Sequence, residues 1–136
     1  MDSLNGSNKK TVDVQEVLQQ ITKGYWKKKV EDIQYHINNG DNKQVSELKS
    51  KLPAFTISAT YKGKRKPENL ESYSGLLHLD YDKLDNIKDV KSKIISNSYT
   101  YAAFVSPSGK GLKVLVKCDN NMSSHKHSGF FCVPVN

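Results

Sequence analysis

Two carboxylates spaced two residues apart, Asp80 and Asp82, are the side chains of this sequence best suited to chemistry. They close the stretch 75–82, whose apolar run predicts a β-strand. Because a strand directs alternate side chains to opposite faces, both acids are expected on the same face. The opposite face is expected to meet the core through Leu77, Leu79 and Tyr81.

Ionised carboxylates this close repel each other unless a cation or a shared proton lies between them. Mg²⁺ is commonly held by one or two carboxylates together with water and the phosphates of a substrate. We therefore predict that Asp80 and Asp82 can share a divalent cation such as Mg²⁺. The alternative interpretation is that they cap the next helix or line a solvated strand end.

A second stretch with chemical character lies between two predicted strands, at residues 106–113. Its glycines permit close approach of the backbone to a ligand, and its lysines add positive charge. We predict that it binds the phosphates of a nucleoside triphosphate through the backbone of Gly109 and Gly111 and the charges of Lys110 and Lys113. The stretch lacks the frame of a Walker A loop, and a plain hairpin turn is the alternative interpretation.

The charge of the chain favours an anionic partner. The formal net charge is +7 over 136 residues, with lysine and arginine concentrated at 27–29, 62–66 and 110–117. Nucleic acid or a nucleotide is the partner that this charge favours, and Lys64, Arg65 and Lys66 could hold a nucleic-acid backbone. No signal peptide or membrane-spanning segment is recognisable, so we expect no membrane association and a cytoplasmic protein.

Hydrophobic periodicity predicts an α+β fold. Residues 1–11 are expected to be a disordered leader and residues 12–136 one domain. Helical spacing predicts helices at 14–21, 25–37, 44–51 and from 87 to about 97. Alternation predicts strands at 54–61, 75–82, 100–105 and 112–117, the first two as neighbours in one sheet. The order of the last four elements is typical of a split β-α-β, ferredoxin-like or RRM-like core, here preceded by N-terminal helices.

Residues 52–54, 75–82 and 104–113, taken together, resemble the VirE N-terminal domain family, and the likeness extends over about residues 50–117. That family belongs to the archaeo-eukaryotic primase-like proteins of bacterial mobile elements, which are commonly fused to a helicase-like ATPase. The resemblance implies a DNA primase/polymerase-like nucleotidyltransferase domain of a mobile-element replication protein. It also implies that Asp80 and Asp82 are catalytic residues that bind Mg²⁺ or Mn²⁺, and that the enzyme acts on a single-stranded nucleic-acid template. The hairpin residues that it implies for binding of the incoming nucleotide are Ser106, Ser108, Gly109, Gly111 and Lys113.

The sequence departs from the primase pattern at two points, so it does not decide whether the chain is catalytically active. Lys113 stands where the wider superfamily has histidine, and the third metal-binding acid is not found. The chain ends in the apolar segment 130–136, so we expect a domain truncated at its C-terminus. A catalytically inactive nucleic-acid-binding module, a truncated remnant and a partner-docking fragment are therefore alternatives to an active enzyme.

Overall fold

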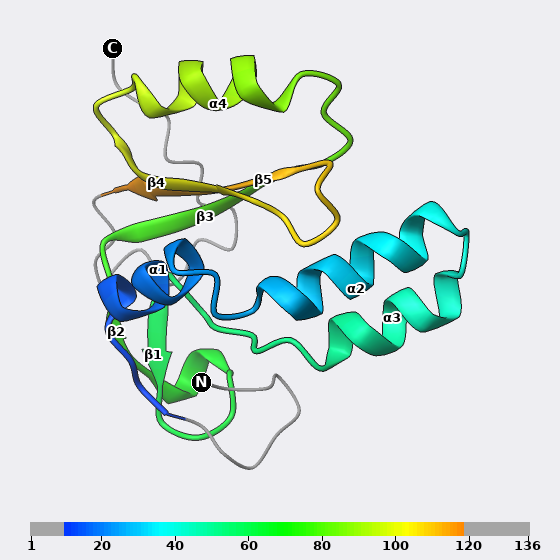
Figure 1. Ribbon diagram of the computed structural model, residues 1–136. Helices are drawn as coiled ribbons and strands as arrows, with labels where there is room; N and C mark the ends of the chain where they lie inside the picture. Colours follow the sequence, from blue (N-terminus) through cyan, green and yellow to red (C-terminus); the bar gives the residue numbers. More distant parts are fainter. Residues whose placement is uncertain (1–9, 119–136) are drawn as a thin grey trace. The chain divides into compact units, whose positions relative to one another are not determined.

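The computed structural model describes residues 10–118, which form two compact units (Figure 1). The described part of the first unit comprises residues 10–55 and 106–109, and that of the second comprises 56–105 and 110–118. The chain is mixed α+β, as predicted. Its helices are α1 Val14–Thr22, α2 Lys27–Asn38, α3 Asn42–Ser50 and α4 Ile87–Ile95, with a short 3₁₀ turn at Pro67–Asn69. Its strands are β1 Ala59–Tyr61, β2 Leu70–Tyr73, β3 Leu76–Tyr81, β4 Thr100–Val105 and β5 Leu112–Lys117.

The first unit is built on three short helices, and the starts of α1 and α3 are fixed by acidic caps. Asp13 accepts a hydrogen bond from the backbone of Gln15 at the start of α1, and Asp41 accepts one from Gln44 in α3. Helices α2 and α3 lie side by side (Figure 1). The periodicity that predicted these helices is the burial pattern of the unit, in which one residue per helix is buried: Val17, Ile33 and Val45.

The second unit contains the predicted split β-α-β core. Strands β3 and β4 both pair antiparallel with β5, which lies between them in the order β3-β5-β4. β3 and β4 are therefore parallel, and α4 connects them. Asn86 caps α4 by accepting a hydrogen bond from the backbone of Asp89. This topology places the end of β3 and the start of β5 directly opposite each other, because Tyr81 pairs with Leu112.

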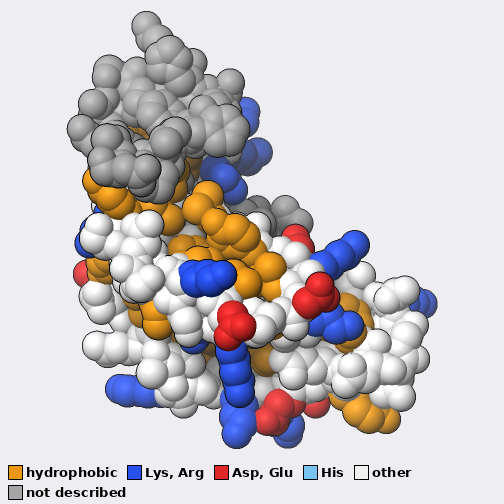
Figure 2. Space-filling model, turned by 90° about the horizontal axis from the view of Figure 1, so that it is seen from above, with side chains coloured by type: hydrophobic (Ala, Val, Ile, Leu, Met, Phe, Trp, Pro, Cys, Tyr) orange, Lys and Arg blue, Asp and Glu red, His pale blue; other side chains and the backbone are white. Residues whose placement is uncertain are grey.

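Helix α4 covers one face of this sheet. Alternate β5 residues are buried against it, and the cluster comprises Leu112, Val114 and Val116 with Leu84, Ile87, Val90, Ile94 and Ala103. Leu79 and Tyr81 face the same way, since they pair with Val114 and Leu112. They remain 41% and 40% exposed, so the expectation that they are buried in the core is wrong. In the view of Figure 2, hydrophobic side chains reach the surface among charged and other polar ones.

The expected pairing of strand 54–61 with strand 75–82 is also wrong. β1 is limited to Ala59–Tyr61 and pairs with β2 in a separate two-stranded sheet. The reason lies in the intervening loop, where Gly63 adopts a left-handed φ of +86° and reverses the chain. β2 was missed because Leu-Glu-Ser-Tyr has exposed residues at its two central positions and lacks apolar alternation.

The outer parts of the chain lie outside the described residues. These are residues 1–9 and 119–136, which contain most of the predicted leader and the segment on which the predicted truncation rests. Within residues 10–118, none of the helices has the length and apolar character needed to cross a membrane.

Candidate functional site

Asp80 forms an ion pair on the sheet face opposite α4. Its register partner on β5 is Lys113, whose Nζ donates to Asp80 Oδ1 at 2.8 Å. Direct cross-strand neighbours have Cβ atoms about 5 Å apart, so a long lysine reaches a short aspartate without leaving the sheet surface. The Asp80 side chain is 49% exposed and that of Lys113 is 30% exposed. The pair joins one residue of each sequence motif, the acid strand and the glycine-lysine hairpin.

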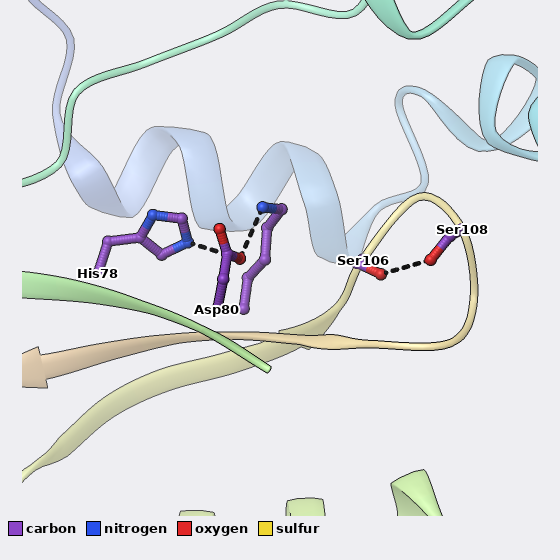
Figure 3. A network of polar contacts seen from close by, with 5 residues as sticks. His78, Asp80, Ser106 and Ser108 are labelled. Carbon is purple, nitrogen blue, oxygen red and sulfur yellow. Dashed lines mark hydrogen bonds and ion pairs between the residues drawn. The ribbon is translucent and has the colours of Figure 1, made fainter. Parts of the chain in front are cut away.

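His78 completes this cluster from the same strand. Its Nε2 lies 3.3 Å from the same Asp80 oxygen, and Figure 3 shows the imidazole and the carboxylate turned toward each other. Partial burial lowers the pKa of His78 from its ordinary value, and the charge of Lys113 adds to this while Asp80 opposes it. His78 is therefore neutral at neutral pH, and Lys113 supplies the cation that balances Asp80. Alternation along β3 could have found His78, which lies two residues from Asp80.

The second oxygen of Asp80 is open. Both the lysine and the histidine contact Oδ1, whereas Oδ2 makes no hydrogen bond or ion pair with residues 10–118. Asp82 follows the last residue of β3, is exposed, and has a carboxylate without a bonded partner in the same range. The capping alternative finds no support, because Asn86 provides the cap of α4. Three carboxylate oxygens are thus unengaged at the end of β3.

The backbone ties the end of β3 to the hairpin. Lys83 follows Asp82 with a left-handed φ of 53°, a conformation that costs a non-glycine residue about 1 kcal/mol. The next amide, that of Leu84, donates to the carbonyl oxygen of Lys110 at 2.8 Å. Gly111 is buried between Lys110 and β5. The structure therefore brings Lys110 and Gly111 to the end of the acid strand, as it brings Lys113 to Asp80.

The remaining hairpin residues form a turn that belongs to the first unit. The Gly109 amide donates to the Ser106 carbonyl oxygen at 2.9 Å, and Gly109 has a φ of +76°. The hydroxyl oxygens of Ser106 and Ser108 lie 3.0 Å apart (Figure 3). Gln34 of α2 donates to the Pro107 carbonyl oxygen at 3.4 Å. The hairpin-turn interpretation accounts for this geometry, and phosphate binding by Ser106, Ser108 and Gly109 stays a prediction.

Phe104 is a neighbour of the site that the sequence did not single out. It pairs with Lys113 on β4, so Asp80, Lys113 and Phe104 form one row across the three strands. The ring is partly buried. The register of β4 on β5 was the information needed to find it.

The predicted nucleic-acid residues lie in the ordered connection between β1 and β2. Lys64, Arg65 and Lys66 are exposed there. Asn69 fixes the loop by donating from its side chain to the Lys64 carbonyl oxygen at 2.8 Å. Lys66 lies 3.8 Å from Glu68, a distance and exposure typical of weak surface pairs. The loop presents positive charge, and nothing in its geometry tests the expected partner.

The donor set fits a hard divalent cation held by few protein ligands. Asp80 and Asp82 offer carboxylate oxygens, which Mg²⁺ and Mn²⁺ prefer, and Mg²⁺ takes its remaining ligands from water and phosphates. Within residues 10–118 no group of three or more His, Cys, Asp or Glu side chains could hold a metal ion. His78, Asp80 and Asp82 therefore do not gather as a three-ligand set, and joint binding of a metal ion by Asp80 and Asp82 stays a prediction.

Comparison with protein families corrects the resemblance drawn from the sequence. The sequence model of the family described as "BT4734-like, N-terminal domain" matches residues 47–133, which include the whole stretch that suggested VirE. The assignment to the VirE N-terminal domain family is therefore wrong. Searches among curated proteins and among solved structures find no significant match. Because the match covers more than half of the 136 residues, the chain belongs to the BT4734-like N-terminal domain family.

Proposed function

We propose that the second unit binds a nucleoside triphosphate together with Mg²⁺ or Mn²⁺ at the end of β3. The observation that carries this proposal is the Asp80–Lys113 pair, in which one carboxylate oxygen remains open beside a cation. Asp80 Oδ2 and the Asp82 carboxylate would hold the metal, which would neutralise phosphate charge. Lys113 and Lys110 would bind phosphate oxygens.

Lys113 can contact the Asp80 carboxylate and a phosphate at the same time. Its ammonium group has three N–H donors, of which Asp80 accepts one. The other two can point to a phosphate that bridges the metal and the lysine. A lysine suits this role as a point charge, whereas it cannot replace a neutral imidazole. The arrangement therefore supports binding of a triphosphate better than proton transfer.

Nucleotidyl transfer of the primase-polymerase kind is the reaction that we propose for this site. Two-metal phosphoryl transfer normally needs a further carboxylate, so the two acids of the described site support binding more strongly than turnover. A single-stranded template and a cytoplasmic location belong to the same proposal. The helicase-like ATPase partner followed from the VirE resemblance alone, and we do not propose it.

The experiment is calorimetric titration of nucleoside triphosphate with Mn²⁺ into the wild-type chain and its acid variants. We expect metal-dependent binding by the wild type that is lost in Asp80→Asn and Asp82→Asn. Asp85→Asn is the matched control, since Asp85 is an exposed acid three residues beyond Asp82 and should leave binding unchanged. Absence of binding by a folded wild-type chain, or equal losses in all three variants, would contradict the proposal.

A catalytically inactive nucleic-acid-binding module is the second candidate, favoured by the ordered basic loop between β1 and β2. In that case Lys64→Ala, Arg65→Ala and Lys66→Ala together should abolish binding of a single-stranded oligonucleotide. Asp80→Asn should leave that binding unchanged. An electrophoretic mobility assay at two salt concentrations separates the two candidates.

A further inference from the structure

The corner between α1 and α2 presents an aromatic ring beside a run of lysines. Tyr25 is 75% exposed, the largest value among the exposed large hydrophobic residues of the described chain. Its ring contacts that of Trp26 edge to face, with centroids 5.3 Å apart and an interplanar angle of 76°. Lys27, Lys28 and Lys29 follow directly and are all exposed. We call Tyr25 and these three lysines the corner patch.

The backbone holds Tyr25 in place. Gly24 adopts a left-handed φ of 70°, and its amide donates to the Ile21 carbonyl oxygen at 3.0 Å. The Tyr25 amide donates to the Gln20 carbonyl oxygen at 3.0 Å, and the Lys27 amide donates to the Gly24 carbonyl oxygen at 3.0 Å. The exposed ring is therefore mounted on a hydrogen-bonded turn, so little backbone freedom is lost when a ligand contacts it.

The charge of the corner patch opposes what the helix prefers. The first turn of α2 carries the three lysines and no acid, although the positive end of the helix dipole lies there. Lys27 has one weak partner, Glu31 at 3.8 Å, with both side chains more than half exposed. Lys28 and Lys29 have no ion pair with residues 10–118. Lysines at the positive end of a helix dipole, without an acid in the same turn, destabilise the helix, and such local conflicts are typical of binding sites.

We propose that the corner patch binds single-stranded nucleic acid, with one base stacked on Tyr25 and phosphates held by the lysines. An exposed aromatic ring beside cations is the arrangement by which proteins hold unpaired strands, because stacking tolerates any base and the cations track the backbone. Duplex bases are already stacked and cannot use the ring. The residues belong to the first unit alone, so the proposal is independent of the metal-nucleotide site.

Trp26 provides a local reporter for the test, since it is the only tryptophan of the chain and touches Tyr25. We would titrate a thymidine oligonucleotide of about 15 residues into the full chain, a length within the range of single-strand binding sites. Tryptophan fluorescence and the anisotropy of the labelled oligonucleotide would be recorded together. Quenching of the Trp26 fluorescence that saturates at the same oligonucleotide concentration as the anisotropy would locate the strand at the corner patch.

Variants separate stacking from charge. Tyr25→Ser should weaken binding by about 5- to 150-fold, the range of one stacked base. Tyr35→Ser is the control, because Tyr35 is 65% exposed on α2, the helix that carries the three lysines, and its replacement should leave affinity unchanged. Replacing Lys27, Lys28 and Lys29 by glutamine should reduce the slope of log affinity against log salt by about 2, at roughly 0.7 per phosphate.

Several results would overturn the proposal. These are unchanged affinity in Tyr25→Ser, equal losses in Tyr25→Ser and Tyr35→Ser, or a salt slope unaffected by the lysine replacements. A duplex of the same length that binds as tightly as the single strand would also overturn it. So would a fluorescence change with anionic phospholipid vesicles but none with the oligonucleotide, since a membrane would then be the partner.

Discussion

Replacing Lys113 with methionine should change metal binding and nucleotide binding in opposite directions. In the wild type, Lys113 Nζ lies 2.8 Å from Asp80 Oδ1, so a divalent cation must bind a carboxylate that is already paired. Methionine keeps the length and apolar stem of the side chain but removes the charge. Mn²⁺ alone should therefore bind the variant more tightly, whereas Mn²⁺ with a nucleoside triphosphate should bind it more weakly.

The magnitudes follow from the exposure of the pair. With side chains 30% and 49% exposed, we place the pair near the upper end of surface ion pairs, about 1 kcal/mol. Its loss should tighten Mn²⁺ binding roughly fivefold. A hydrogen bond from Lys113 to a phosphate is worth about 1.5–3 kcal/mol, so its loss should weaken the ternary complex roughly 10- to 150-fold.

Water-proton relaxation measures Mn²⁺ binding without nucleotide, and calorimetry measures the ternary complex. Lys117→Met is the matched control, because Lys117 is an exposed lysine on the same strand and alternates to the same face as Lys113. It should leave both affinities unchanged. A Lys113→Met variant that folds but loses, gains or keeps both affinities together would refute the reasoning.

Three further predictions concern stability. Gly109→Ala should cost about 1 kcal/mol in urea unfolding, because φ is +76°. A Cβ at this position would also lie 3.1 Å from Gln34 Nε2. Gly63→Ala is the control, because Gly63 also has a left-handed φ but no atom within 4 Å of the added Cβ. Equal losses of stability in the two variants would show that the contact with Gln34 adds nothing. The pKa of His78 is lowered in the folded state, so the unfolded chain binds the proton first and stability should fall as pH drops below about 6.5. His78→Gln should flatten this dependence, and an unchanged profile would contradict it. Leu112→Ala, fully buried under α4, should cost about 2–5 kcal/mol, while Leu79→Ala, 41% exposed, should cost much less; comparable losses in thermal unfolding would contradict the assigned burial.

The elements with strong periodicity were predictable. Helices α1, α3 and α4 and strands β4 and β5 lie within a few residues of their predicted bounds. The split β-α-β order also followed from the sequence, since strand, helix, strand, turn and strand have few compact arrangements. The start of α2 shifted from residue 25 to Lys27 because Gly24 ends α1 with a left-handed turn that also includes Tyr25 and Trp26.

Weak local signals account for the errors in the second unit. The predicted strand 54–61 alternates well, yet only Ala59–Tyr61 pairs, because its partner β2 is too short to extend the ladder. The burial of Leu79 and Tyr81 could not be predicted from β3 alone. Alternation states which face a side chain is on, whereas burial depends on whether another element covers that face.

The Asp80–Lys113 pair shows what joins two motifs that are 33 residues apart. Each motif was recognisable by itself, but their contact depends on the register of β3 on β5, which a shift of one residue would have reversed. That register follows from burial, because Leu112, Val114 and Val116 must face α4. Lys113 must then face away from α4, and so must its neighbour Asp80 on β3. The burial of Leu112, Val114 and Val116 under α4 therefore positions the Asp80–Lys113 pair on the opposite face of the sheet.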